Sequence, residues 1–506
     1  MLKNSDLFSL IKSLDLNERR YLIAAGRKDA ESDSGYVEIL KAMAALDEYS
    51  EEKAKEIISR YSRSEKTDVK KHYLFYWILK RLHDYHSSRY KGIGEISNIK
   101  VLMDRSLHEQ ASRIIPAIKS RLIASENYPE LLLLLELELK ISMYSQKLNP
   151  AVVLAEVQGY SKQYADLKML QFVRFQLRQI LDINIFIRNE TNKKAVEKLT
   201  AGMIQLAPTK NTGRLIQYNY NLILFWKNAT SNDWKSAFKY AYRNYQLMCS
   251  GDSQIRKFPD ETVHSFFNLL SSSFVSDKEI YNKVIAEFKK TISAPLTSRI
   301  RNDSLFFIHL SKLIYFNHNH QVFAKTNFIE EAIDFIRSHR KQIPRTRLNN
   351  FYFDLAKSLF YLRDYKHAFS VLNDIYQNLN VPGHNRDFYT HSRILFCLSC
   401  YENKETDLMR YVAKSAEEYM KRNAILYRFE KRFIAFIGRE LFRFESMKSA
   451  QKIQKLESLE ADLIQIFESP YERSVLNYFD YPYWVRLKIA DLQSSIGNNA
   501  ILTQIP

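Results

Sequence analysis

The amino-acid sequence predicts an all-α protein: a right-handed α-solenoid of helical hairpins, preceded by a small N-terminal helical domain. The first observation is a shortage of turn-forming residues, since the 506 residues include only 11 glycines and 11 prolines. Average usage would give about 60 of the two together. Sheets need such residues at their turns and helices exclude both from their interiors, so the composition disfavours all-β and α/β folds. The second and third observations are the helical spacing of apolar residues and a pattern of paired helices that recurs along the chain.

Residues 1–90 have the size of a small helical domain. The apolar residues of segment 7–14 are spaced 3, 1 and 3 apart, as one face of a helix requires. Asp15 then stands three positions before Glu18, an acidic variant of the capping box that predicts the start of a second helix. Further helices are expected near 36–49, 51–61 and 68–86. The segment 87–94, SSRYKGIG, combines glycines with serines and is the expected domain boundary.

Residues 91–490 are expected to form helical-hairpin repeats. Prolines punctuate polar, loop-like stretches of this region, with gaps of 36 to 58 residues between them by subtraction. These prolines are Pro150, Pro208, Pro259, Pro295, Pro344 and Pro382. Each gap suits one or two hairpins, and a repeat of about 40 residues gives about eight to ten hairpins in all. The last residues, 491–506, are expected to form a poorly ordered tail.

The clearest repeat lies in segment 345–376. An apolar stripe is followed by a short RDY turn, and the second helix then places Ala368 where the two helices approach each other closely. This pattern resembles the tetratricopeptide repeat, with Tyr352 at its first aromatic position, although Ala356 stands where that repeat has glycine. Weaker echoes occur in segments 108–115 and 234–241. The resemblance implies a tetratricopeptide-like solenoid with a groove that holds peptides.

Three segments carry a wider resemblance: the opening LFSLIKSLDLNERRYL, the basic aromatic helix ILYRFEKRFIAFI and the closing YFDYPYWVRLKI. In these the chain resembles a family of bacterial helical-repeat proteins known chiefly from Bacteroidota, over nearly its whole length. The resemblance implies a helical-repeat fold and a cytoplasmic bacterial setting. It implies no activity, because none is established for that family, and it transfers no functional residue.

Charge is unevenly distributed along the chain. Of a net charge of +18, the segment 191–349 carries +12, from 24 basic and 12 acidic residues. A field of that sign attracts acidic peptides, nucleic acid or anionic lipid, although the same charge can serve solubility alone. Three cysteines are too few for a disulfide framework in so long a chain and suit a reducing cytoplasm. We expect neither a secretory signal nor membrane insertion, because apolar stretches are short and interrupted by charges.

Two groups of residues stand out as candidate partner-binding sites. The first is a basic run that leads into one face of the clearest repeat and comprises Arg337, Arg340, Lys341, Arg345, Arg347, Asn350, Phe353 and Lys357. If the tetratricopeptide resemblance holds, Asn350, Phe353 and Lys357 line the peptide groove. The second is a stripe along one expected helix, 426–444, formed by Arg428, Arg432, Arg439 and Arg443. Arginines in either group can pair with carboxylates or phosphates, or can simply cover a neighbouring apolar surface.

Other motifs with chemical potential are better explained by structure. Cys397-x-x-Cys400 lies in an apolar helix and fits a packed core better than a redox or metal pair. Two histidine pairs, His83 with His86 and His318 with His320, lack identifiable partner ligands. Phosphate-cradling and nucleophile motifs are missing. We therefore expect no catalytic residue, metal or cofactor.

The function expected from the sequence is that of a non-catalytic scaffold. Such a scaffold would bind a protein or peptide segment, of acidic character, in the groove of the solenoid. The alternative is a nucleic-acid-binding repeat protein that uses its basic middle third, with some of its 32 tyrosines and 31 phenylalanines stacked on bases.

Overall fold

The chain is all-helical in the computed structural model, which contains no strand among the residues it describes. The described residues are 4–28, 34–46, 48–61, 67–85, 91–144, 148–183, 186–209, 212–250, 257–276, 278–293, 298–319, 327–377 and 386–502. None of the described helices combines the length and the apolar composition that crossing a bilayer requires. The chain forms two compact units, Met1–Tyr164 and Ala165–Pro506.

Unit 1 contains α1 (Asn4–Ser13), α2 (Leu16–Lys28), α3 (Ser34–Ala45), α4 (Glu51–Arg60), α5 (Thr67–Tyr85), α6 (Lys91–Asp104), α7 (His108–Ala124), α8 (Tyr128–Ser142) and the first half of α9 (Pro150–Ile183). The first expected helix face is buried, with Leu7 and Ile11 fully inside. The predicted capping box is confirmed: the Glu18 N–H donates to Asp15 Oδ1 and the Asp15 N–H donates to Glu18 Oε2, both at 2.8 Å.

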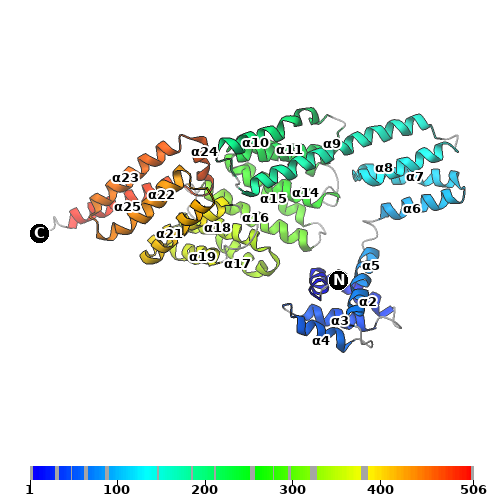
Figure 1. Cartoon of the computed structure of the whole chain (residues 1–506), viewed down its shortest axis with the longest axis horizontal. Helices are drawn as coiled ribbons and strands as arrows, with labels where there is room; N and C mark the ends of the chain where they lie inside the picture. The colour runs from blue at the N-terminus through cyan, green and yellow to red at the C-terminus, as the bar shows by residue number, and fades with distance from the viewer. Residues whose placement is uncertain are drawn as a thin grey trace. The chain divides into compact units, whose positions relative to one another are not determined.

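Unit 2 continues from α9 as a succession of helices in which neighbours in sequence pack side by side (Figure 1). Its α-helices are α10 (Glu190–Ala201), α11 (Arg214–Thr230), α12 (Trp234–Cys249), α14 (Pro259–Ser272), α15 (Lys278–Ile292), α16 (Ser298–His318), α17 (Phe328–His339), α18 (Arg345–Tyr361), α19 (Tyr365–Gln377), α20 (Arg386–Glu402), α21 (Thr406–Arg422), α22 (Arg428–Arg439), α23 (Ser449–Ile466), α24 (Pro470–Arg473) and α25 (Tyr481–Leu502). Short 3₁₀ helices join them: η1 (Gly202–Leu206), η2 (Ser273–Val275), η4 (Arg340–Gln342), η5 (Leu441–Ser446) and η6 (Ser474–Asn477).

One turn geometry recurs between paired helices. Six of the described residues other than glycine adopt a positive φ of 51° to 63°, namely Ser106, Glu126, Asn232, Arg363, Lys404 and Ala424. After each, the next N–H bonds the carbonyl five residues back, as from Asp364 to Leu359 at 2.9 Å, which is the Schellman closure of a helix. The residue five positions beyond the turn is fully buried in all six hairpins: Ala111, Leu131, Ala237, Ala368, Met409 and Phe429. The small residues Ala111, Ala237 and Ala368 thus occupy equivalent places.

The segment 470–484 crosses the ends of several helices of unit 2, and we call it the crossing segment. Its Asn477 accepts a hydrogen bond from Trp234 Nε1 at 2.9 Å, and Phe479 stacks on Tyr361 with ring centroids 5.0 Å apart. Trp484 Nε1 donates to Glu402 at 2.8 Å. The crossing segment therefore connects α12, α18 and α20, which are far apart in sequence.

Several expected features lie wholly or partly outside the described residues. They are the boundary segment 87–94 at its residues 87–90, Pro295, Pro382, His86, His320 and the end of the chain from 503. Helix α25 runs to Leu502, through most of the segment that was expected to be a tail. Helix α22 ends at Arg439 and the chain continues as η5, so the single helix expected over 426–444 is divided in two.

Candidate functional site

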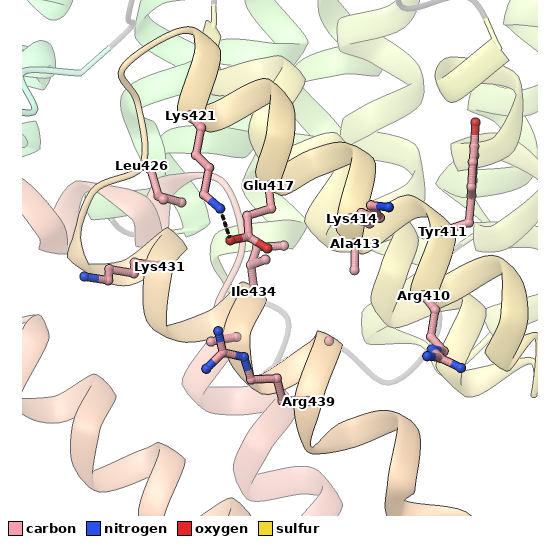
Figure 2. Close-up of a pocket in the computed structure, with 12 residues that line it drawn as sticks. Arg410, Tyr411, Ala413, Lys414, Glu417, Lys421, Leu426, Lys431, Ile434 and Arg439 are labelled. Carbon is pink, nitrogen blue, oxygen red and sulfur yellow. Dashed lines mark ion pairs between the residues drawn. The ribbon is translucent and has the colours of Figure 1, made fainter.

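A groove of about 670 Å³ lies between α21 and α22, and we call it the basic groove (Figure 2). It is lined by Arg410, Tyr411, Ala413, Lys414, Glu417, Lys421, Leu426, Lys431, Ile434, Ala435, Gly438 and Arg439. Five of these side chains are basic and one is acidic, which is the feature that makes the groove a candidate binding site.

The groove follows from the local sequence of the two helices. Helix α21 buries its Met409 and Ala416 against unit 2, so its Arg410 and Lys414, one turn apart, face outward. The turn at Ala424 reverses the chain and sets α22 against α21. Small residues then leave space between the facing surfaces, and a Cβ atom at Gly438 would meet nothing within 4 Å.

Most of the cations in the groove are not neutralised. Lys421 pairs with Glu417 at 2.6 Å, as the dashed line in Figure 2 marks. No carboxylate among the described residues pairs with Lys414, Lys431 or Arg439. Positive charge is therefore present on both walls, where it can bind carboxylates or phosphates through charge-assisted hydrogen bonds.

One further arginine, Arg443, extends the positive surface beside the groove, and it shares an aromatic ring with the groove residue Arg410. The guanidinium carbons of Arg410 and Arg443 lie 4.8 and 5.3 Å from the centroid of the Phe442 ring. This ring is a platform that holds two exposed like charges close to it without an acidic partner. Tyr411, 66% exposed, adds an aromatic side chain to the rim.

The structure places the predicted basic run 337–347 on the surface, where most of it is paired with acids. Arg337 contacts Asp334 at 3.2 Å within α17. Arg345 contacts Asp374 at 3.1 Å and Arg347 contacts Asp303 at 2.9 Å, each on another helix. Arg340 and Lys341 are exposed in η4. This run is therefore much closer to neutral than its sequence suggests.

The predicted groove face of α18 is mostly buried. Asn350 is exposed, but Phe353 and Lys357 are only 4% and 6% exposed. Phe353 packs on Phe388 of α20 with centroids 5.5 Å apart, and Lys357 pairs with Asp354 at 2.6 Å. Lys357 also lines one small cavity together with residues 476–480 of the crossing segment. At Phe353 and Lys357, the face that was expected to receive a peptide therefore packs against α20 and the crossing segment, while Asn350 stays exposed.

The predicted arginine stripe is only partly a common surface. Arg428 is exposed at the start of α22, and Arg432 is held by Asp462 at 2.6 Å and by Glu440 at 3.3 Å. Arg439 lines the basic groove and Arg443 lies beside it on η5. No hydrogen bond, ion pair or ring contact among the described residues joins this stripe to the run at 337–357.

The sequence interpretation missed Arg410, Lys414 and Lys431. A signal for them was present, because Arg410, Lys414 and Lys421 are spaced 4 and 7 apart and so share a helix face, by the criterion applied to the arginine stripe. The opposite face of that helix is the apolar one.

A buried ion cluster, which the sequence did not reveal, holds α22 from its inner side. Arg188, fully buried, donates from Nη1 and Nη2 to the two oxygens of Glu430 at 3.0 and 3.1 Å. The same Nη2 lies 3.2 Å from Glu472 of the crossing segment. Glu472 also accepts the backbone N–H groups of Arg428 and Phe429, at 2.9 and 3.3 Å. This carboxylate therefore caps the N-terminus of α22.

Two more titratable groups, Asp387 and His391 of α20, complete the cluster. Tyr478 donates to Asp387 at 3.1 Å, and its ring stacks on His391 with centroids 4.2 Å apart. Burial raises the pKa of Asp387 to about 7, against the attraction of Arg188. Burial, reinforced by Arg188 and Lys357, lowers the pKa of His391 well below its ordinary value, which keeps the ring neutral. Because these groups are inaccessible, they position α22 and the crossing segment and cannot contact a partner.

A second groove, of about 930 Å³, lies between α9 and α10 in unit 2 and is largely apolar. Met169 and Phe172 are its most exposed apolar lining residues, at 53% and 55%, and Lys198 is its one charged lining residue. It offers apolar contact area but little that would select a partner by charge. No three side chains of His, Cys, Asp or Glu among the described residues are grouped as a metal site would require.

Comparison of the chain with family models, with curated proteins and with solved structures finds no match. The function must therefore be argued from the basic groove and its surroundings.

Proposed function

We propose that the chain is a non-catalytic helical-repeat scaffold that holds an acidic segment of a partner protein in the basic groove. The observation that carries this proposal is the set of cations on both walls of the groove that have no acidic partner in the described part of the chain. Like charges that lie close together without counter-charges repel one another, and a bound acidic segment would relieve that repulsion.

The lining also indicates the shape of the partner segment. Leu426 and Ile434 give the groove an apolar floor, and Ala435 and Gly438 allow close approach. An amphipathic segment fits this lining best, with apolar side chains on the floor and Asp or Glu toward the two basic walls.

We also propose that the hairpins of unit 2 form a right-handed, tetratricopeptide-like solenoid of the Bacteroidota type, in a cytoplasmic setting. The recurring turn with its buried residue five positions later supports this, because it gives unlike sequences one common hairpin geometry. Ala237 and Ala368 then occupy the small-residue position of the repeat.

Nucleic acid is the less favoured occupant of the groove. Proteins that bind single strands stack successive bases on several aromatic side chains. Tyr411 is the single aromatic side chain among the described residues that line the groove. The basic middle third, on which that alternative rests, has Arg299, Arg345 and Arg347 paired with acids.

The experiment measures fluorescence anisotropy of a labelled synthetic peptide that carries an apolar stripe flanked by glutamates. The groove variant combines Lys414→Glu, Lys431→Glu and Arg439→Glu. Loss of three exposed charge contacts, each worth about 0.5 kcal/mol, should weaken binding by about tenfold or more. A lysine-flanked version of the peptide should bind neither protein.

The matched control reverses Arg337, Arg340 and Lys341, three exposed cations elsewhere in unit 2, and so changes the net charge equally. It should retain peptide binding to within about twofold, since net charge at a distance is screened by salt. A steric test compares Gly438→Trp with Gly159→Trp, because both glycines have open space around a Cβ atom. Equal loss of binding in both triple variants, or tighter binding of a labelled single-stranded RNA through the same groove residues, would overturn the proposal.

A further inference from the structure

The buried ion cluster contains more negative than positive side chains. Arg188 is the cation, with a fully buried side chain, and three carboxylates surround it: Asp387, Glu430 and Glu472, which are 2%, 1% and 7% exposed. Lys357 is near but is paired with its own partner at 2.6 Å. A buried carboxylate that is ionised without a compensating positive group costs several kcal/mol. Each of the three carboxylates therefore needs its own source of positive charge if it is to be ionised.

Two of the three carboxylates have a clear source of compensating positive charge. Glu430 receives both Nη atoms of Arg188, in the two-point geometry that stabilises an ionised carboxylate. Glu472 receives two backbone N–H groups at the N-terminus of α22, where the helix dipole also favours negative charge. Arg188 therefore compensates the charge of Glu430, and the N-terminus of α22 compensates the charge of Glu472.

Asp387 is the carboxylate for which no separate positive group is left among the described residues. Its hydrogen-bond donor is the uncharged hydroxyl of Tyr478, at 3.1 Å. The charged and titratable groups that face it are Arg188 before α10, Glu430 of α22, Tyr419 of α21 and Tyr478 of the crossing segment. It lies in the first turn of α20, but no backbone N–H of the described residues donates to it. The dipole of that helix is worth at most about 2 kcal/mol, less than burial of a free charge costs.

We infer that Asp387 carries a proton in mildly acidic solution and that loss of this proton toward neutral pH loosens the attachment of the crossing segment to α20. The charge balance above carries the inference, and burial, which raises the pKa of Asp387 to about 7, agrees with it. The inference concerns the interior of unit 2 and holds whatever occupies the basic groove.

The loosened element is identified by what Asp387 contacts. Tyr478 joins Asp387 to the crossing segment and also lines a cavity of about 110 Å³, together with Asn477 and Phe479. A water molecule occupies about 30 Å³ in the liquid, so the cavity has room for the few waters that an ionised Asp387 needs. Ionisation would draw water toward Tyr478 and weaken its packing on His391, whose ring lies 4.2 Å away.

The pH dependence follows from the direction of the shift. The folded-state pKa of Asp387, about 7, is raised above the unfolded value near 3.8. Between these values the folded chain holds a proton that the unfolded chain has released, so stability falls as pH rises and is then level above about 7. The neutral His391, with its lowered pKa, acts in the opposite sense below pH 6.5, because the unfolded chain takes up a proton there. Comparison with an Asp387 variant cancels the histidine contribution.

The first measurement follows urea unfolding of the full chain from pH 5 to 8.5 for the wild type and for Asp387→Asn. The unfolding constant of the wild type divided by that of Asp387→Asn should rise by up to about tenfold per pH unit between about pH 5 and 7 and then level off. The matched control is Asp407→Asn, because Asp407 holds the same second position in α21 but is exposed. Its ratio to wild type should stay flat over that range.

The second measurement needs no variant. Infrared spectra of the native protein with carbon-13-labelled aspartate should show a protonated carboxyl band that is shifted by the label and disappears near pH 7. Hydrogen exchange, corrected for its intrinsic pH dependence, should then accelerate in segment 470–484. Absence of an aspartic-acid band at pH 6, or a flat unfolding ratio for Asp387→Asn, would overturn the inference.

Discussion

The substitution Arg188→Met should destabilise unit 2 far more than loss of a comparable surface ion pair. Arg188 has a fully buried side chain, donates two hydrogen bonds to Glu430 and lies within hydrogen-bond distance of Glu472. Removing one member of a buried ion pair leaves the other charge unpaired, which costs about 3–5 kcal/mol. Glu472 keeps its two backbone donors at the start of α22, so the penalty falls mainly on Glu430.

The assay is urea unfolding followed by tryptophan fluorescence, since Trp226, Trp234 and Trp484 all lie in unit 2. The control is Arg299→Met. Arg299 contacts both oxygens of Asp260, at 2.9 and 3.1 Å, but its side chain is 66% exposed. Such a pair is worth about 0–1 kcal/mol, so this variant should unfold almost like the wild type.

A double variant tests whether the cost comes from an unpaired charge. Arg188→Met combined with Glu430→Leu removes both members of the pair and leaves an apolar contact in their place. It should be more stable than Arg188→Met alone, because apolar replacement of a whole buried pair is often neutral. The reasoning is refuted if Arg188→Met costs less than about 1 kcal/mol, or if the double variant is the less stable of the two.

Three further outcomes are expected. Ala368→Trp should destabilise the protein by about 1–3 kcal/mol or more, because Ala368 is fully buried between helices, whereas exposed Lys366→Gln should cost little; equal melting temperatures would contradict the close contact. Lys404→Gly should raise the free energy of unfolding by about 0.5–1 kcal/mol, since the φ of 62° suits glycine; an unchanged free energy of unfolding would refute this strain. Burial raises the pKa of Cys400 to about 12, and Cys397 is fully buried, so neither should react with a thiol reagent before unfolding; labelling of either in the native protein would be inconsistent with this packing.

Local features could be predicted from the sequence because their physical causes are local. The scarcity of glycine and proline predicted helices throughout, and the described residues contain no strand. The capping box at Asp15 depends on residues three positions apart and is confirmed by two hydrogen bonds. The burial of Ala368 and of Cys397 follows from helical spacing within a single hairpin.

Contacts between distant segments could not be predicted in this way. Arg188 is 242 residues from Glu430 and 284 from Glu472, and no spacing rule connects positions so far apart. Phe353 and Lys357 do lie on one face of helix α18, as their spacing predicts. Helical periodicity cannot say which segment packs against that face. Phe353 packs on Phe388 of α20, and Lys357 shares a small cavity with the crossing segment, which lies more than 100 residues further along the chain.

For the same reason the sequence does not show which of its surface charges are paired. The sequence draws attention to the run at 337–347, yet Arg345 and Arg347 find Asp374 and Asp303 on other helices. Along the sequence the cations of helix α21 alternate with Glu417 and other acids, so they form no basic run. In space α21 faces α22, which is itself basic, and Arg410 and Lys414 of α21 have no acidic partner among the described residues, whereas Lys421 pairs with Glu417. Surface charge available for binding is what remains after such pairing.

Helix α22 lies between the buried ion cluster and the basic groove. Its inner side carries Glu430, bound by Arg188, and its first turn is capped by Glu472. Its outer side presents Lys431 and Arg439 to the basic groove. Since the inner contacts fix the helix in place, the repulsion between the cations of the groove cannot be relieved by displacing it. A groove that is already formed also loses little entropy when a segment binds, so the affinity of a partner should depend on its charge and shape.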